Sequence, residues 1–304
     1  MQSTSYIAMI RPVNFGYNEQ TASSNAFQSK PEIQTTVQDE ALKEFDQLVE
    51  KLQKEGINVS VFSDTITPPT PDSIFPNNWI STHHDGTIFL YPMQAENRRQ
   101  ERRADLLERL QLDFEVSKIV DLSFFEKEEK FLEGTGSMVL DRQHHIAYAC
   151  ISPRTDPEVL RQFCQLANYQ CVTFNATDSQ GKPIYHTNVM MCMGENFCTI
   201  CLDSITDFDE RTTVMESFLS TGKEVVQITR EQMNCFAGNM LQLKNTQGED
   251  LLIMSSSAYQ SLSRPQKQQL EKFCRIVSSD LHTIEKIGGG SARCMIAEIH
   301  LPKK

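Results

Sequence analysis

Residues 37–62 read VQDEALKEFDQLVEKLQKEGINVSVF, and this stretch decides the fold class because its outline recurs along the chain. Its apolar residues fall at helical spacing from Val37 to Leu52, which predicts an amphipathic helix. Gly56 ends that helix, and residues 57–62 are typical of a strand. The stretch is therefore one helix followed by one strand.

The same helix-then-strand order appears four more times, at intervals of roughly 50 to 60 residues. In the third copy, Asp156 is a candidate N-cap and Pro157 occupies the first helical position. The expected helix and strand cores are 106–110 with 114–120, 157–166 with 170–174, 214–219 with 224–228, and 270–274 with 281–284. Five such units predict an α/β fold in which repeated units pack against one another.

A conspicuously polar or glycine-bearing segment follows each predicted strand at a similar offset. These segments are 71–79, 131–137, 183–188, 234–239 and 288–295. If the units close into a ring, equivalent offsets converge on its central axis. A cysteine, a histidine, a glutamate and several asparagines would then meet in one place.

Composition excludes several classes of function. The 304 residues include 29 basic and 40 acidic side chains, and no cluster of Lys and Arg with interleaved aromatics predicts a nucleic-acid partner. Neither a leader pattern nor a long apolar run is present, so no membrane partner is expected. Nine cysteines, an odd number scattered through apolar runs, favour a reducing, cytoplasmic location.

No cofactor or metal is expected from the motifs. Cys198 and Cys201 have the spacing of a metal or redox pair, but no second pair accompanies them. No Walker or Rossmann glycine pattern is present, so we predict no nucleotide cofactor. The polar residues 14–34 predict a long loop, which is usually functional or mobile in a compact protein.

Residues 288–295 read GGGSARCM, and this segment is the strongest candidate for chemistry. Three glycines allow a ligand to approach the backbone closely. Cys294 begins the apolar run 294–297, so we expect it at the start of a strand, presented as a nucleophile. The alternative is a glycine hairpin beside an inert buried thiol.

Several motifs together resemble the guanidino-group-modifying (pentein) superfamily, which includes arginine deiminase, dimethylarginine dimethylaminohydrolase, amidinotransferases and succinylarginine dihydrolase. Within it, the chain is most similar to the citrulline utilisation hydrolases. The motifs are Arg11-Pro12, Asn25-Ala26-Phe27-Gln28, residues 75–79, Asn97-Arg98-Arg99, Leu132-Glu133-Gly134, Tyr185-His186-Thr187-Asn188, and Gly289-Gly290 with Arg293-Cys294-Met295. The resemblance implies a five-bladed, pseudo-symmetric α/β propeller (the pentein fold) formed by residues 1–304 as a single domain.

The resemblance also implies catalytic roles. Cys294 would be the nucleophile, His186 the general acid and base, and Glu133 the carboxylate that orients the histidine. A Cys–His pair with a third orienting group follows the general logic of activated nucleophiles. The structural alternatives are a hydrogen-bonded core histidine at 186 and a surface turn carboxylate at 133.

Two asparagines carry the prediction of substrate class. Family members that act on guanidinium groups have aspartates at the positions of Asn78 and Asn188, where they bind the cation. Amides offer both a donor and an acceptor, which match the carbonyl and N–H groups of a neutral ureido group. We therefore expect a ureido substrate such as citrulline. Alternatively, either asparagine caps a turn and arginine derivatives still bind.

The remaining candidates would hold the rest of the substrate. Asp72 corresponds to a family carboxylate that contacts the ligand, and arginines bind carboxylates in bidentate fashion. The candidates for the substrate carboxylate are Arg98, Arg99 and Arg154, and Asn234 and Asn239 are further candidates for the pocket wall.

Three functions stay open at this point. The first is hydrolysis of citrulline to ornithine, ammonia and carbon dioxide through a covalent cysteine adduct. The second is an arginine deiminase or amidinotransferase type of reaction on arginine or a derivative. The third is a non-catalytic protein that binds a small amino acid. A small-molecule partner is common to all three, and the sequence does not decide between a monomer and a homo-oligomer.

Overall fold

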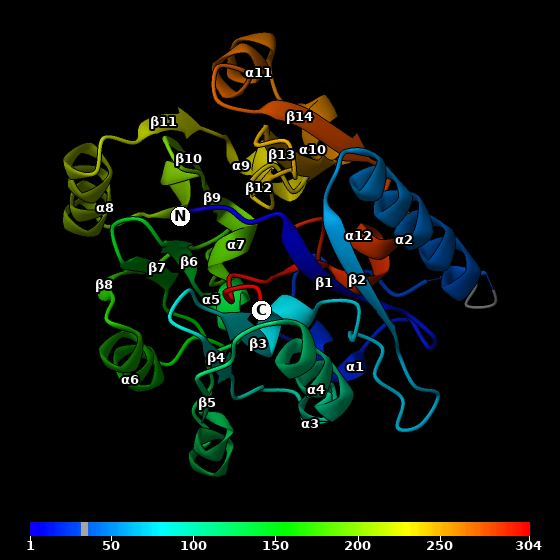
Figure 1. The fold of residues 1–304 in the computed structure, drawn as a ribbon. Helices are drawn as coiled ribbons and strands as arrows, with labels where there is room; N and C mark the ends of the chain where they lie inside the picture. The colour runs from blue at the N-terminus through cyan, green and yellow to red at the C-terminus, as the bar shows by residue number, and fades with distance from the viewer. Residues whose placement is uncertain (32–35) are drawn as a thin grey trace.

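The strands form five three-stranded sheets arranged around a central axis (Figure 1). The computed structural model describes residues 1–31 and 36–304. The sheets, each given in the order of its strands, are β3 (Ile80–Thr82), β4 (Thr87–Leu90) and β5 (Lys118–Asp121); β6 (Val139–Asp141), β7 (Ile146–Cys150) and β8 (Gln170–Phe174); β9 (Met191–Met193), β10 (Phe197–Ile200) and β11 (Glu224–Gln227); β12 (Leu241–Lys244), β13 (Asp250–Ser255) and β14 (Arg275–Ser279); and β15 (Ala297–Glu298), β1 (Tyr6–Arg11) and β2 (Asn58–Ser63). This arrangement confirms the predicted five-bladed α/β propeller.

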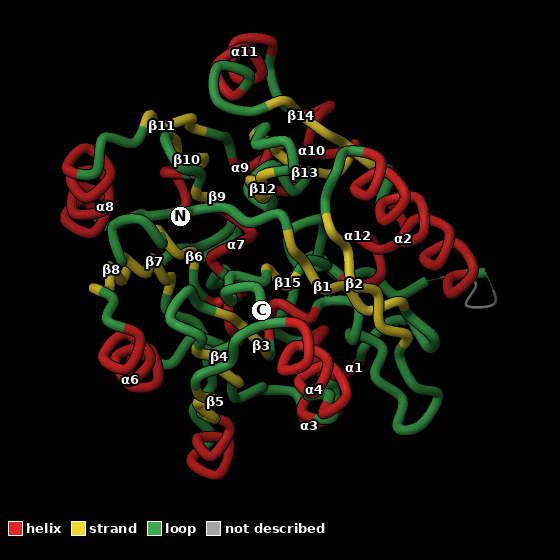
Figure 2. The backbone as a smooth tube through the Cα atoms, in the orientation of Figure 1, coloured by secondary structure: helices red, strands yellow, loops and turns green. Residues whose placement is uncertain are grey.

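Each blade has the same topology. The middle strand pairs antiparallel with the first strand and parallel with the third, as β4 does with β3 and β5. Parallel strands require a crossover, and each crossover contains one or two helices, the longest of which lie on the outside of the ring (Figure 2). These helices are α1 (Glu19–Ala22), α2 (Val37–Lys54), α3 (Glu96–Arg99), α4 (Ala104–Asp113), α6 (Pro157–Ala167), α8 (Phe208–Ser220), α10 (Ser256–Ser261) and α11 (Arg264–Leu270).

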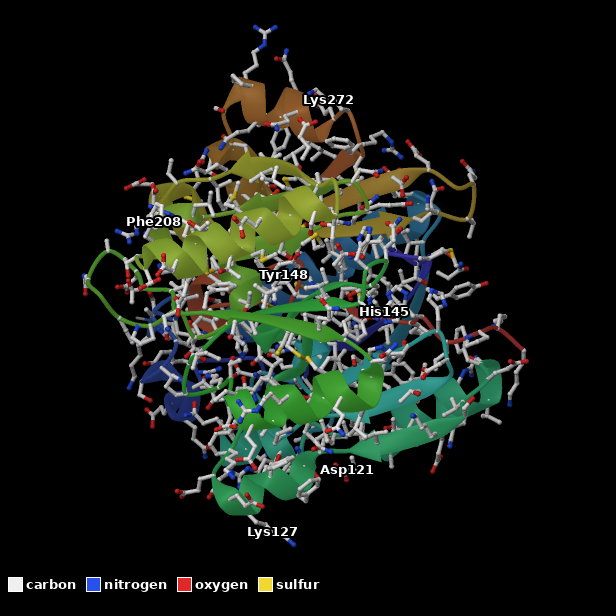
Figure 3. The ribbon with its side chains drawn as sticks, turned by 90° about the vertical axis from the view of Figure 1, so that its left-hand side faces the viewer. Asp121, Lys127, His145, Tyr148, Phe208 and Lys272 are labelled. Carbon is white, nitrogen blue, oxygen red and sulfur yellow. The ribbon has the colours of Figure 1, made fainter. Side chains whose placement is uncertain are left out.

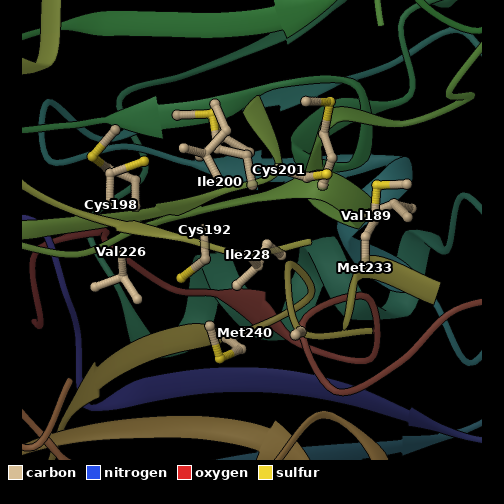
Figure 4. Close-up of a cluster of buried hydrophobic side chains, with 14 of the residues drawn as sticks. Val189, Cys192, Cys198, Ile200, Cys201, Val226, Ile228, Met233 and Met240 are labelled. Carbon is tan, nitrogen blue, oxygen red and sulfur yellow. The ribbon is translucent and has the colours of Figure 1, made fainter. Parts of the chain in front are cut away.

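The first and middle strands of each blade are mostly buried, and the third strand is more exposed. All five residues of β7 are buried, whereas four of the five in β8 are exposed or half-buried. In a neighbouring blade, Cys192, Cys198, Met233 and Met240 pack in an apolar cluster (Figure 4). On the outside, polar side chains such as Lys127 and Lys272 project away from the ring (Figure 3). Each repeated unit therefore contributes buried strands to the interior and polar side chains to the surface.

The first four helices predicted from apolar spacing are present, whereas the fifth, expected over 270–274, lies earlier as α11 and ends at Leu270. The buried face of α2 consists of the six apolar residues that define its period: Val37, Ala41, Phe45, Leu48, Val49 and Leu52. The Asp156 side chain caps α6 by accepting hydrogen bonds from the N–H groups of Glu158 and Val159. In α8, Leu219 is helical as expected, but 69% of it is exposed.

Three boundaries were predicted wrongly. The third strand of the fifth unit is β14, Arg275–Ser279, and residues 281–284 instead begin helix α12 (His282–Gly288). The strand expected over 114–120 begins only at Lys118. Cys294 lies in a turn, and the strand that follows it starts at Ala297. The polar stretch 14–34 contains α1, and its last residues, 32–34, lie outside the described part of the chain.

Short helices and turns occupy the centre of the ring. They follow the outer strands and lead into the first strand of the next blade: η1 (Pro76–Asn78), α5 (Gly134–Ser137), α7 (Thr187–Met190), the turn after α9 (Arg230–Asn234), and the turn formed by residues 291–295. Helix α5 packs against both η1 and α7. Two further short helices, η2 (Ser123–Glu128) and η3 (Leu202–Ser204), lie outside this set.

The C-terminal strand closes the ring. β15 pairs antiparallel with β1, with Ile7 opposite Glu298 and Ala8 opposite Ala297. The two ends of the chain therefore complete one blade together. Among the helices of the described residues, none has both the length and the apolar character needed to cross a membrane.

Candidate active site

Cys294 is held in a tight turn beside the glycine loop. Helix α12 ends at Gly288 and is capped by Gly289, whose φ of 65° is in the left-handed region that glycine adopts readily. The Cys294 N–H donates to the carbonyl of Ser291 at 3.0 Å, which closes the turn. Cys294 as a whole is 3% exposed.

Two asparagine amides point at the sulfur. Asn188 Nδ2 and Asn239 Nδ2 each lie 3.2 Å from Cys294 Sγ, in position to donate hydrogen bonds. The Asn239 side-chain oxygen accepts the backbone N–H of Arg293 at 3.1 Å, so this amide also fixes the turn. N–H donors directed at the sulfur stabilise its anionic, reactive form.

His186 and Glu133 form a buried pair. His186 Nε2 lies 2.8 Å from Glu133 Oε2, and the backbone N–H of Gln94 donates to Glu133 Oε1 at 3.0 Å. Burial lowers the pKa of His186 to about 4, although the bond to Glu133 opposes this shift. The imidazole is therefore neutral near pH 7 and able to accept a proton.

Glu133 is ionised in spite of its burial. Burial alone raises the pKa of a carboxyl group, but Arg154, His186 and Arg98 outweigh that effect and hold the pKa of Glu133 well below its usual range. Arg154 Nη1 donates to Glu133 Oε2 at 3.4 Å, and Arg98 Nη1 lies 3.7 Å from the same oxygen. Such pairing is what makes a buried charge tolerable.

One small cavity brings most of the predicted residues together. Its lining includes Cys294, His186, Asp72, Asn78, Arg98 and Arg154, together with Asn25, Phe75, Tyr185 and the loop 288–290. Glu133 lies behind His186, and Asn188 and Asn239 reach the sulfur. The convergence of the axial segments is therefore observed, whereas the catalytic and binding roles stay predictions.

Two candidates lie elsewhere. Arg99 directs its guanidinium at the carbonyls of Met93 and Gln94, at 3.1 and 3.3 Å, and lies 3.7 Å from Glu126. Asn234 lines a separate, larger cavity of about 560 Å³ and is exposed. Neither residue belongs to the lining of the cavity beside Cys294.

Sequence reasoning missed three residues that shape the site. Glu101 binds the Arg98 guanidinium with two short hydrogen bonds, of 2.9 and 3.0 Å. The Tyr185 hydroxyl donates to the carbonyl of Gly289 at 2.6 Å. Gly136 lies so close to Asn78 and His186 that no side chain fits there. The Gly-Thr-Gly run after Glu133 was a usable signal for Gly136, but Glu101 is hidden in a run of charged residues.

A buried ion cluster lies directly after the nucleophile. Arg293 Nη2 donates to Glu298 Oε2 at 2.8 Å, and His300 Nε2 lies 3.0 Å from Glu298 Oε1. Burial and the neighbouring Arg142 lower the pKa of His300 to about 4, against the opposing effect of Glu298. The cluster joins Arg293 and His300 to Glu298 of the closing strand β15.

The comparison with protein families decides the family of this chain. Residues 11–301 match the family described as N,N dimethylarginine dimethylhydrolase, eukaryotic. The chain belongs to this family. Members of the dimethylarginine dimethylhydrolase family hydrolyse carbon–nitrogen bonds other than peptide bonds, so the predicted superfamily and the predicted class of reaction are confirmed at this level.

Solved structures agree on the fold of this dimethylarginine dimethylhydrolase family member. Cyanobacterial ArgZ, an arginine dihydrolase, is 17% identical with a TM-score of 0.77 over 98% of this chain. The chain spans only 41% of full-length ArgZ, but 98% of its N-terminal domain, at 18% identity and a TM-score of 0.76. A dimethylarginine dimethylaminohydrolase is 14% identical with a TM-score of 0.66, covering 98% of this chain and all of the other. A search of curated proteins finds no significant match.

Gly136→Ala is expected to lower kcat/KM by about 100-fold or more, because misplacing a catalytic group by about 1 Å costs that much. The added Cβ would overlap Asn78 Nδ2 and lie 2.8 Å from His186 Nδ1. Hydrolysis of ureido or guanidino amino acids measures the effect. Gly16→Ala is the matched control, since an added Cβ there meets nothing within 4 Å. Equal activity of the two variants contradicts this account of the site.

His300→Gln is expected to change how stability depends on pH. Because the pKa of His300 is lowered from 6.5 to about 4 in the folded state, its contribution to the free energy of unfolding is complete above pH 6.5. That contribution is lost as pH falls toward 4, by up to about 3 kcal/mol. Urea unfolding of wild type and variant at several pH values measures the difference. His282→Gln, at an exposed histidine, is the control, and parallel pH profiles for wild type and His300→Gln contradict the prediction.

Proposed function

We propose that this protein is a citrulline hydrolase of the citrulline utilisation type, which converts citrulline and water to ornithine, ammonia and carbon dioxide. The observation that carries the proposal is the pair of asparagine amides, Asn78 and Asn188, in place of carboxylates around the Cys294 thiol. Family membership supports hydrolysis of a carbon–nitrogen bond, and the amides support an uncharged group at the reacting carbon.

The two amides present complementary groups. Asn188 Nδ2 is directed at the sulfur, and Asn188 Oδ1 is a buried acceptor without a hydrogen-bond partner among the described residues. Asn78 Oδ1 accepts from Arg98 Nη1 at 2.8 Å, and Asn78 Nδ2 uses one hydrogen on Asn77 Oδ1 at 3.1 Å. One N–H of Asn78 and the oxygen of Asn188 are therefore available to a substrate.

A ureido group matches this pattern better than a guanidinium does. Its carbonyl oxygen accepts a hydrogen bond and its amino group donates, whereas a guanidinium only donates. A guanidinium would also enter beside the buried Arg98 cation without a carboxylate at position 78. Donor pattern and charge thus favour the same substrate class.

The chemistry starts with transfer of the thiol proton to His186, whose neutral imidazole accepts it while Glu133 stabilises the resulting imidazolium. Cys294 Sγ then forms a bond to the ureido carbon, and Asn78 stabilises the oxyanion of the tetrahedral intermediate. One carbon–nitrogen bond breaks, and His186 gives its proton to the departing amine. Water attacks the remaining thiocarbamate-type adduct, and the carbon–sulfur bond breaks to restore the thiol and give a carbamic acid. The carbamic acid then loses carbon dioxide as its remaining carbon–nitrogen bond breaks, which releases the second amine.

Asp72 and an arginine fit the amino-acid end of the substrate. Asp72 Oδ2 accepts from Asn18 and Thr21, but Asp72 Oδ1 is buried and has no partner within the described ranges. This oxygen fits the α-ammonium. Arg154 and Arg98 both line this cavity and are the candidates for the α-carboxylate. Each also donates to protein acceptors, Arg154 to Glu133, Ser24 and Thr21, and Arg98 to Glu101, Asn78 and backbone carbonyls.

The second candidate is hydrolysis of arginine. ArgZ, which shares the fold, is an arginine dihydrolase, and the description of the family names dimethylarginine as the compound that is hydrolysed. Arginine would first give citrulline, as a deiminase does, and a dihydrolase would continue to ornithine. An amidinotransferase and a silent amino-acid-binding protein stay as further alternatives.

A single assay separates these functions. The protein is incubated separately with citrulline, arginine and dimethylarginine, and ornithine, citrulline and ammonia are quantified. We expect ornithine from citrulline and none with Cys294→Ser. Citrulline from arginine or dimethylarginine, with citrulline itself untouched, would replace the proposal by the second candidate. Binding without turnover of any of the three would favour the silent protein.

Asn78→Asp is expected to lower kcat/KM for citrulline by about 100-fold, because one donor to the oxyanion contributes about 3 kcal/mol. The new carboxylate would pair with Arg98 and favour a guanidinium, so the inhibition constant of arginine should fall. Steady-state kinetics with arginine as competitor measures both effects. Unchanged constants for both compounds refute the argument from the amides.

A further inference from the structure

We propose that Glu101, through Arg98, is a positioning residue that fixes the orientation of the Asn78 amide and thereby helps to select a ureido substrate. This inference rests on the function proposed above. It adds to that function a residue outside the cavity lining, because Glu101 touches Arg98 rather than the space beside Cys294.

The first step of the argument is the fit between Glu101 and Arg98. Both side chains are almost fully buried, and Arg98, in α3, lies three residues before Glu101 in the chain. Arg98 Nε donates to Glu101 Oε1 at 2.9 Å and Arg98 Nη2 donates to Glu101 Oε2 at 3.0 Å. This bidentate geometry fixes the plane of the guanidinium as well as its position.

The second step is competition among three carboxylates for one cation. Arg98 lies 3.8 Å from Asp72 and 3.7 Å from Glu133, both farther than Glu101. Glu101 therefore keeps Arg98 from closing onto Asp72, whose free oxygen is the candidate site for the substrate ammonium. It also leaves Arg98 Nη1 directed at Asn78.

The third step is the orientation of the amide. The Arg98 guanidinium only donates hydrogen bonds, so the atom of Asn78 that faces it at 2.8 Å must be the oxygen. The amino group of Asn78 is then turned toward Asn77 and the cavity. Without a fixed guanidinium, only the 3.1 Å hydrogen bond to Asn77 holds this orientation. The amide then rotates more easily by half a turn and presents its oxygen, which suits an N–H donor instead of a carbonyl.

The test is a double-mutant cycle on citrulline turnover. Glu101→Gln should lower kcat/KM by about tenfold in the wild-type background. In the Asn78→Asp background the same change should lower it by less than about threefold, because a carboxylate has two equivalent oxygens and itself holds Arg98. A general loss of structure would lower kcat/KM by the same factor in both backgrounds.

Glu126→Gln is the matched control. Glu126 binds Arg102 in the same bidentate way, at 2.6 and 3.0 Å, outside the cavity lining, so its change should leave kcat/KM within about twofold of wild type. If Glu101→Gln does not fold, Arg98→Lys replaces it, because lysine keeps the buried charge but lacks the planar group that spans Glu101 and Asn78. The same difference between backgrounds is expected.

The outcomes separate the two proposals. If wild type hydrolyses citrulline but Glu101→Gln loses the same factor in both backgrounds, the positioning role is overturned and the proposed function survives. If wild type leaves citrulline untouched, the proposed function fails, and the positioning role fails with it. If Glu101→Gln loses activity in the wild-type background but not in the Asn78→Asp background, the result supports both the positioning role and the proposed function.

Discussion

The antiparallel pairing of β15 with β1 is the interaction on which the site depends. It joins the C-terminal end of the chain to its N-terminal strand and completes the fifth blade. Cys294 lies three residues before β15, and Glu298 within β15 binds the side chain of Arg293. Ring closure and placement of the thiol are therefore one structural event, and the nucleophile has its native surroundings only when all five blades are in place.

The second constraint is the balance of buried charge around the thiol. Glu133, Glu101 and Asp72 face Arg98 and Arg154 in a region that water barely enters. Each carboxylate is tolerated because a guanidinium or a set of N–H groups lies beside it. Because these groups are oriented before substrate binds, they need little reorganisation as charge develops during a reaction.

The polar segment near the N-terminus covers this region by hydrogen bonds. Asn25 and Gln28 donate to the carbonyls of the glycine loop, and Arg154 donates to the Thr21 carbonyl and the Ser24 hydroxyl. One guanidinium therefore touches both the covering segment and Glu133. The length and polarity of residues 14–34 made a functional segment foreseeable, while its contacts required the folded ring.

The sequence by itself determined the five units, most of their helices and the chemical types that gather at the axis, because apolar spacing, caps and repeated offsets are local properties. The sequence analysis failed at the fifth unit, where it predicted the strand over 281–284. The strand is β14, Arg275–Ser279, and residues 281–287 follow the helical spacing of α12. Only the tertiary structure decided between Arg98 and Arg99. Adjacent residues on a helix point about 100° apart, so Arg98 enters the site while Arg99 turns to Glu126. The orientation of the Asn78 amide was likewise beyond the sequence, because it depends on a guanidinium twenty residues away and on the carboxylate that holds it.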